Sequence, residues 1–170
     1  MPVLRFLGGA VVEDDSGEAA RIASRRHPVA LLALLATAPS RTLSRGKLVG
    51  YLWPETSEKR ARNRLGTCVH QVRSSLGEEV LASVGDDLRL AADAVDCDVW
   101  RFREAAEEGE LEAAVEHYGG PFLDGFRLPD APAFEKRVER QRTELAGEHH
   151  RALERLAEAA EERGEPERAA

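Results

Sequence analysis

Residues 56–77 read TSEKRARNRLGTCVHQVRSSLG and have the pattern of one amphipathic helix. Apolar side chains recur at spacings of three and four residues, which places them on one stripe that must pack against the rest of a domain. These residues are Ala61, Leu65, Cys68, Val69, Val72 and Leu76. Thr56 or Ser57 can cap the start of the helix, and Gly77 can end it.

The opposite face of this helix is polar and carries side chains that suit DNA. Asn and Gln match the edge of adenine, Arg matches guanine, and the methyl group of Thr can contact thymine. We predict that bases are contacted by Arg60, Asn63, Thr67, His70 and Gln71, and phosphates by Lys59, Arg62, Arg64 and Arg73. Because every surface helix has a polar face, this pattern alone leaves a merely solvated face as an equal alternative.

The charge of the chain is divided between its two halves. Residues 1–90 contain 13 Lys and Arg against 10 Asp and Glu, whereas residues 91–170 contain 11 against 21, so charges of +3 and −10 make up the net −7. Between Arg21 and Leu76, 11 basic residues meet only two acids, Glu55 and Glu58. A polyanion can therefore bind the first half despite the acidic total.

The segments before this helix indicate a small sheet and two shorter helices. Val3–Val12 and Ala19–Ala23 are predicted to be strands. The apolar run Val29–Ala36, with Pro28 in its first turn and Pro39 after it, predicts a short buried helix. After a brief strand at Arg41–Leu43, Ser44 can cap a second helix that ends before Pro54.

The segment after residue 77 predicts a β-hairpin. Val80–Val84 and Leu88–Ala91 are short apolar pieces separated by Gly85, Asp86 and Asp87, a turn signal close to the Asp-Gly type. Three helices followed by a hairpin indicate a winged helix-turn-helix, in which the last helix enters the major groove and the hairpin touches neighbouring backbone.

Beyond Asp93 the sequence becomes helical and acidic. Residues 98–107 and 110–118 predict a helical hairpin, and the apolar loop Gly119–Pro132 is expected to pack. A long helix is predicted from Ala133, with a possible kink or break at Gly147 and an end at Gly164. We therefore predict a mainly α protein with small β-sheets, divided into domains at residues 1–92 and 93–170.

The sequence lacks the residue patterns that are typical of several classes of protein. The longest apolar run, Val29–Ala36, is far shorter than the roughly 20 residues of a membrane-spanning helix, and the N-terminus lacks a signal-peptide layout, so we expect a cytosolic protein. Cys68 and Cys97 are isolated, and the five histidines have no metal-ligand spacing. Without nucleophile or phosphate-loop motifs, no enzyme activity, metal or cofactor is expected.

Taken in order, several segments resemble bacterial transcriptional activators of the antibiotic-regulatory (SARP) type, in which an OmpR-like winged helix precedes a bacterial transcriptional activator domain. The matching segments are LRFLG (4–8), RRHPVALLALL (25–35), SRGKL (44–48), YLWP (51–54), ARN (61–63), VHQVR (69–73), LG (76–77), VDCDVWRF (95–102) and YGGPFLDGF (118–126). Together they cover nearly the whole chain, so their order is more specific than any single motif.

The resemblance implies a winged helix-turn-helix followed by an all-α, TPR-like activator domain. It also implies binding to duplex DNA at promoter direct repeats, with two copies on the DNA, and contact with RNA polymerase. Two features depart from the family. The hairpin tip carries Asp86 and Asp87, which would repel phosphate, and the segment from Leu153 to Ala170 resembles only one repeat helix, a turn and the start of the next helix. A repeat without its partner leaves an apolar stripe uncovered, so we expect a fragment of a larger regulator or pairing with another copy.

The acidic hairpin tip motivates a second hypothesis. The winged helix can be a scaffold that does not read DNA, with the acidic helical half as a protein-interaction surface. The first hypothesis requires a duplex to contact the basic helix, whereas the second requires a protein partner on the acidic half.

Overall fold

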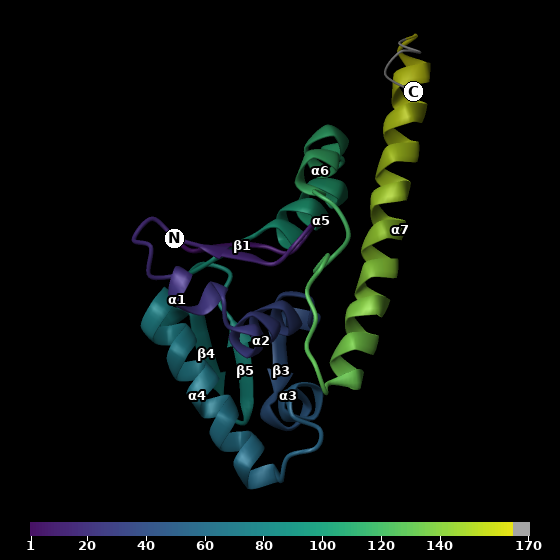
Figure 1. Ribbon diagram of the computed structural model, residues 1–170. Helices are drawn as coiled ribbons and strands as arrows, with labels where there is room; N and C mark the ends of the chain where they lie inside the picture. The colour runs from purple at the N-terminus through teal and green to yellow at the C-terminus, as the bar shows by residue number, and fades with distance from the viewer. Residues whose placement is uncertain (165–170) are drawn as a thin grey trace.

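A computed structural model describes residues 1–164, which form a winged helix beside a helical hairpin and one long helix (Figure 1). In chain order the elements are β1 (Val3–Arg5), β2 (Val11–Glu13), α1 (Ala20–Ala23), α2 (Arg26–Ala36), the 3-10 turn η1 (Pro39–Arg41), β3 (Thr42–Ser44), α3 (Arg45–Leu52), α4 (Glu58–Leu76), the 3-10 turn η2 (Glu78–Val80), β4 (Leu81–Val84), β5 (Asp87–Leu90), β6 (Asp96–Cys97), α5 (Asp98–Glu108), α6 (Leu111–His117) and α7 (Pro132–Glu162). The predicted fold class, mainly α with an α+β N-terminal half, is confirmed.

The winged helix is built from α2, α3 and α4 around a small antiparallel sheet of strand order β3-β5-β4. Its central helix α2 is buried at every position from Pro28 to Ala36, as the apolar run predicts. The predicted cap of α3 forms, because the hydroxyl of Ser44 accepts a hydrogen bond from the Lys47 amide at 3.2 Å. The predicted hairpin also forms: Val84 pairs with Asp87 across a two-residue turn.

A second sheet of order β2-β1-β6 joins the N-terminus to the start of the helical half. The prediction of a strand at Ala19–Ala23 is wrong, since this segment forms α1 and the partner of β1 is β2. Alanine and arginine favour helix over strand. In addition, the Asp14 carboxylate accepts a hydrogen bond from the Ala19 amide at 3.2 Å and so supports the entry into α1.

The chain beyond β1 is bound on both sides by segments of the helical half. The Asp98 carboxylate, at the start of α5, accepts hydrogen bonds from the amides of Phe6 and Leu7 at 3.0 and 2.9 Å. The Leu123 amide donates to the Phe6 carbonyl at 2.7 Å, and the Gly8 amide donates to the Pro121 carbonyl at 2.9 Å. This segment therefore lies between α5 and the loop that precedes α7.

The helical half contains the predicted hairpin, α5 and α6, and the single long helix α7. The imidazole of His149 on α7 stacks on the ring of Tyr118 after α6, with 4.0 Å between the ring centroids, and Arg103 pairs with Glu148 at 2.8 Å. The suggested break at Gly147 is absent, because α7 continues through it. An isolated glycine costs a helix only about 1 kcal/mol, which packing along α7 can offset.

The α7 helix ends at Glu162, just before the predicted stop at Gly164, which is left-handed with a φ of +71°. The remainder of the predicted turn and the start of a following helix lie outside the described residues. The predicted domain division between residues 92 and 93 remains a prediction.

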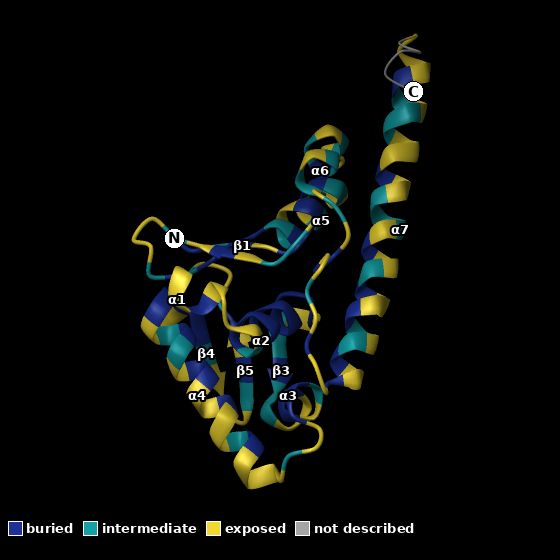
Figure 2. Cartoon of the chain, in the orientation of Figure 1, coloured by how far each residue is buried: buried dark blue, intermediate teal, exposed yellow. Residues whose placement is uncertain are grey.

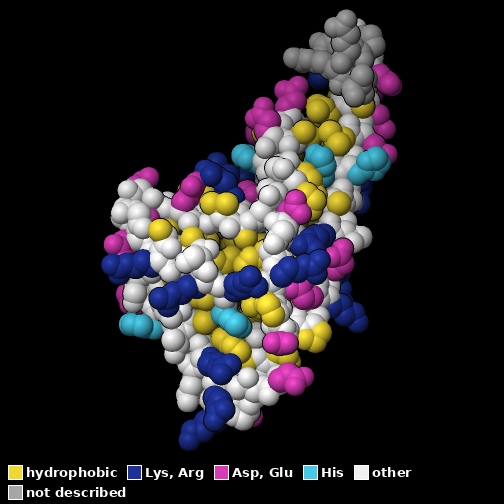
Figure 3. Space-filling view, viewed as in Figure 1, with side chains coloured by type: hydrophobic (Ala, Val, Ile, Leu, Met, Phe, Trp, Pro, Cys, Tyr) yellow, Lys and Arg dark blue, Asp and Glu magenta, His cyan; other side chains and the backbone are white. Residues whose placement is uncertain are grey.

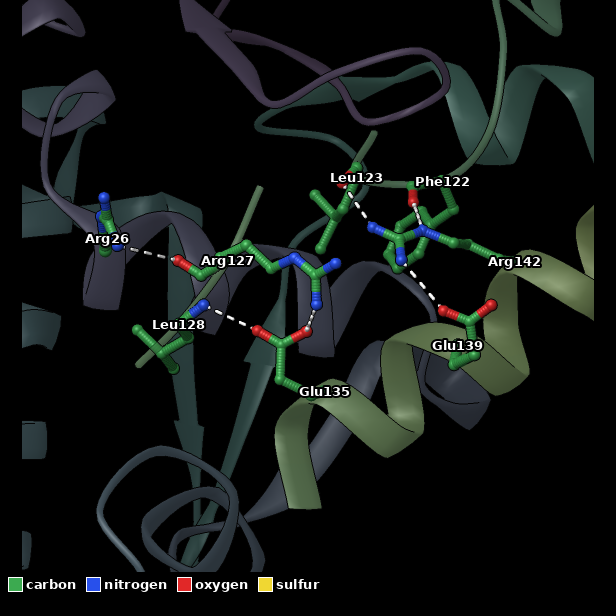
Figure 4. A network of polar contacts seen from close by, with 8 residues as sticks. All are labelled: Arg26, Phe122, Leu123, Arg127, Leu128, Glu135, Glu139 and Arg142. Atoms are coloured by element: carbon green, nitrogen blue, oxygen red, sulfur yellow. Dashed lines mark hydrogen bonds and ion pairs between the residues drawn. The ribbon is translucent and has the colours of Figure 1, made fainter. Parts of the chain in front are cut away.

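The apolar loop before α7 is packed, as predicted, and arginine side chains fix its backbone (Figure 4). Phe122 and Leu123 are buried, and the Arg142 guanidinium donates to both of their carbonyls at 2.7 and 2.8 Å. Farther along the loop, the Glu135 carboxylate accepts a hydrogen bond from the Leu128 amide at 2.7 Å.

Direct contacts connect the winged helix to the helical half. The indole of Trp100 on α5 donates to the carbonyl of Ala36, the last residue of α2, at 2.8 Å. The Arg137 guanidinium on α7 lies over the Tyr51 ring of α3, 5.4 Å from its centroid. Buried side chains from both halves belong to one hydrophobic cluster. The outer face of α4 is exposed, and α7 carries both buried and exposed residues along its length (Figure 2).

Gly8 is required by a close approach between two backbones. Its φ is +102°, and a Cβ there would lie 2.9 Å from the Gly119 carbonyl oxygen. We expect Gly8→Ala to lower the free energy of unfolding by about 1–3 kcal/mol. The matched control is Gly147→Ala, whose new Cβ meets only the Arg151 guanidinium at 3.5 Å and should raise stability by about 0.5–1 kcal/mol. Urea denaturation of both variants measures the difference, and equal changes would contradict the account of Gly8.

Candidate nucleic-acid interface

The helix α4 lies at the edge of the winged helix with one side buried and the other open to solvent (Figure 2). All six residues of the predicted apolar stripe are buried. Glu58 stands in the first turn, and Gly77 ends the helix with a φ of +119°. The amphipathic pattern therefore predicts both the extent of the helix and the side that packs.

The five residues predicted to contact bases share the outward side of α4. Arg60, Asn63, Thr67 and His70 are exposed, and Gln71 is half-buried. The Thr67 hydroxyl donates to the Asn63 carbonyl at 3.2 Å, so its polar group is used by the helix itself. Within residues 1–164, the other four side chains form no hydrogen bond or ion pair and are free to meet a ligand.

One flank of this outward side faces the hairpin β4–β5. The Arg62 guanidinium contacts the Asp86 carboxylate at 3.2 Å, and this hydrogen bond raises the pKa of Arg62. The Arg73 guanidinium donates twice to the Leu81 carbonyl, at 3.1 and 2.8 Å. Two of the three arginines predicted to bind phosphate therefore already have partners within the protein, and a phosphate would have to compete for them.

The other flank borders a hollow of about 380 Å³ between α4 and the first turn of α2. It is lined by Arg25, Arg26, His27, Pro28, Trp53, Arg64, Thr67, Cys68 and Gln71. The His27 and Trp53 rings stack within it, with their centroids 5.0 Å apart. Figure 3 shows Lys, Arg and His side chains gathered on this face over α2 and α4.

Sequence reasoning identified Arg64 of this flank but did not single out Arg25 or Arg26. The available signal was their position, since Arg25, Arg26 and His27 directly precede the buried run of α2. The contact of this turn with α4 is a matter of tertiary packing, which residue spacing within one helix does not reveal.

The cysteines are placed for packing rather than chemistry. Cys68 and Cys97 are both buried and free. Burial raises the pKa of Cys68 to about 11 and that of Cys97 to about 12, so both remain thiols at neutral pH and are poor nucleophiles.

Residues 1–164 offer little support for other kinds of site. No group of three or more His, Cys, Asp or Glu side chains in this range is arranged to hold a metal ion. None of the helices described is long and apolar enough to cross a membrane. A hollow of about 680 Å³ beside α5 contains charges of both signs, and Arg101 and Asp96 on its wall pair with each other.

The fold and the exposed helix define a winged-helix protein with a helical extension, and this architecture is similar to that of a solved structure. EmbR of Mycobacterium tuberculosis, solved in complex with a low-affinity phosphopeptide, matches with a TM-score of 0.61 and 24% sequence identity. The match covers 94% of this chain and 48% of the EmbR chain, so the chain spans about half the length of EmbR. Neither a protein-family model nor a curated protein matches the sequence.

His27 lines the hollow, so its pKa reports on the charges placed there. Burial lowers the pKa of His27 below 6.5, and the nearby Arg64 charge lowers it further. The folded state therefore resists protonation that the unfolded state accepts, and this group makes the free energy of unfolding fall as pH drops through 6.5. We expect Arg64→Gln to raise the pKa of His27, as followed by NMR of its ring protons. An unchanged midpoint would contradict the placement of Arg64 beside His27.

Proposed function

We propose that the protein is a transcriptional regulator of the SARP type that binds duplex DNA in a sequence-specific way through α4. The observation that carries this proposal is the outward side of α4. Its base-matching side chains Asn63, His70 and Gln71 have no partner within residues 1–164, and they are exposed or half-buried. A winged helix inserts this helix into the major groove, where Asn and Gln can read adenine edges.

The distribution of charge supports the same partner. A protein that neutralises DNA phosphates releases their counterions, and the free energy of that release depends on local basic charge rather than on net charge. Lys59, Arg60 and Arg64 are exposed along α4 and form no ion pair among the described residues. We assign Lys59 and Arg64 to phosphate contacts, while Arg62 and Arg73 can contribute only by giving up contacts with the hairpin.

The resemblance to the SARP type extends the proposal to partners. Binding at direct repeats would place two copies of the chain on one promoter, and the acidic helical half would be available to RNA polymerase. The shared architecture with EmbR supports the fold on which this extension depends.

The scaffold hypothesis keeps one observation in its favour, the acidic tip of the hairpin. In the structure Asp86 contacts Arg62 at 3.2 Å, which lessens the repulsion that the sequence suggests. The two hypotheses differ in what a duplex does to α4. Under the scaffold hypothesis, a duplex at low salt leaves the amide NMR signals of residues 58–76 unshifted, while a polymerase subunit shifts those of the acidic half.

The decisive experiment is selection of duplexes from a random pool with this chain at moderate salt. Enrichment of a direct repeat with a period of about one helical turn would establish sequence-specific binding. Absence of enrichment, together with weak binding that salt abolishes, would count against base reading by α4 and favour the scaffold hypothesis.

Two variants then separate base contacts from phosphate contacts. Asn63→Ala should cost about 1–3 kcal/mol of discrimination at one base pair of the selected site. Arg64→Ala should weaken binding to every sequence and reduce the salt slope by about 0.9. Fluorescence anisotropy on a panel of single-base variants measures both. The same behaviour of the two variants across the panel would refute the assignment.

A further inference from the structure

We infer that the hollow between α4 and the first turn of α2 seats the DNA backbone at one border of the major groove, with Arg25 and Arg64 binding its phosphates. This inference rests on the proposed function, which supplies the duplex. It adds Arg25, from a second element of the fold, to the contacts that sequence reasoning placed on α4 alone.

The geometry of a helix in a groove leads to this assignment. Successive residues turn by 100°, so Arg62 and Arg73 lie along one flank of the outward side of α4, and Arg64 and Gln71 lie along the other. A helix with side chains is about 10–12 Å wide and the major groove about 12 Å, so the helix fills the groove and its two flanks face the two bordering strands. Side chains beside either flank of α4 therefore face the phosphates of the bordering strand.

The two flanks differ in the charge that they can offer. On the hairpin flank Arg62 contacts Asp86, and Arg73 is bound to the Leu81 carbonyl. On the hollow flank Arg25 and Arg64 form no ion pair or hydrogen bond through their side chains within the described residues. The unneutralised charge beside α4 thus concentrates on the hollow flank.

The side chains that line the hollow include arginines but no carboxylate. Arg25, Arg26 and Arg64 contribute to it, and no Asp or Glu is among its residues. A concave surface with charges of one sign and an apolar floor strengthens the local potential. Arg26 uses one of its donors on the Arg127 carbonyl, at 3.3 Å, and its other donors remain available. The hollow is therefore suited to an anion.

The shape fits a backbone rather than an unstacked base. Arg64, Thr67, Cys68 and Gln71 follow one stripe along the wall of the hollow, a length of about 10 Å at 1.5 Å per residue. A wall of that length can face more than one phosphate of one strand. Trp53 is only 8% exposed and stacks on His27, so its ring offers no surface on which a base could stack.

The test uses the full chain and the duplex that the selection enriches, with a mixed-sequence duplex at low salt as a second probe. The variants are Arg25→Ala, Arg64→Ala and the double variant. Arg140→Ala is the matched control, because Arg140 on α7 is exposed, has no side-chain partner among the described residues and does not line the hollow. The Arg25 side chain does not cap α2, and circular-dichroism melting verifies that each variant folds.

We expect Arg25→Ala and Arg64→Ala each to reduce the slope of log affinity against log salt by about 0.9, and the double variant by about 1.8. Arg140→Ala should leave the slope unchanged, and Arg25→Lys should restore it because a lysine keeps the charge. Replacing single phosphates by neutral methylphosphonates adds a positional test. At one position the replacement should weaken binding of the wild type and not of Arg25→Ala.

Two different failures are distinguishable. If the wild type binds DNA and Arg64→Ala lowers the slope, but Arg25→Ala behaves like Arg140→Ala, the hollow does not seat the backbone and the proposed function stands. If the wild type shows no salt-dependent binding to either duplex, this inference and the proposed function are both overturned.

Discussion

The Asp98 carboxylate holds the two halves of this protein together. It accepts hydrogen bonds from two consecutive amides, those of Phe6 and Leu7, across more than 90 residues of sequence. Burial raises the pKa of Asp98, while the two amide donors act in the opposite direction. Because the amides lie at the end of β1, the contact fixes the first helix of the acidic half against the N-terminal strand.

The consequences of this junction extend to the long helix. The backbone of residues 6–8, held by Asp98 on one side, pairs with Phe122 and its neighbours on the other, and Arg142 of α7 binds the same loop. Phe6 and Phe122 pack edge to face above these hydrogen bonds, with their centroids 6.3 Å apart. The segment that follows the N-terminal strand thus positions both α5 and α7, and Gly8 in this segment is required by the close approach of two backbones rather than by a ligand.

Local sequence signals predict much of this fold. They fail where a short segment has an ambiguous pattern and where distant segments determine the pairing. Three features each depend on one residue and its immediate neighbours, and the sequence alone predicts them. They are the cap at Ser44, the end of α4 at Gly77 and the hairpin turn at Gly85. The segment 19–23 is short and its pattern ambiguous, and a strand prediction there is overturned by helix propensity and the contact with Asp14. The parallel pairing of β1 with β6 joins residues more than 90 positions apart, so no local pattern predicts it.

The candidate interface likewise has a part that local patterns predict and a part that depends on tertiary packing. Helical periodicity predicts which residues of α4 point outward, and the structure places all five predicted base-contacting residues on that side. Periodicity does not show what stands beside each flank. Arg62 and Arg73 meet the hairpin, and Arg64 meets a hollow, because of how the elements pack.

On the hairpin flank, arginines of the kind that bind phosphate instead hold the hairpin against α4. Arg62 is half-buried and Asp86 is exposed, so water screens their ion pair and a phosphate can displace it. Arg73 is different, since its two hydrogen bonds to the Leu81 carbonyl tie the hairpin to α4, and bonds from a charged donor are roughly twice as strong as neutral ones. These hydrogen bonds fix the hairpin against α4. At the tip of this hairpin, Asp86 faces Arg62 of α4, so its negative charge is balanced within the protein.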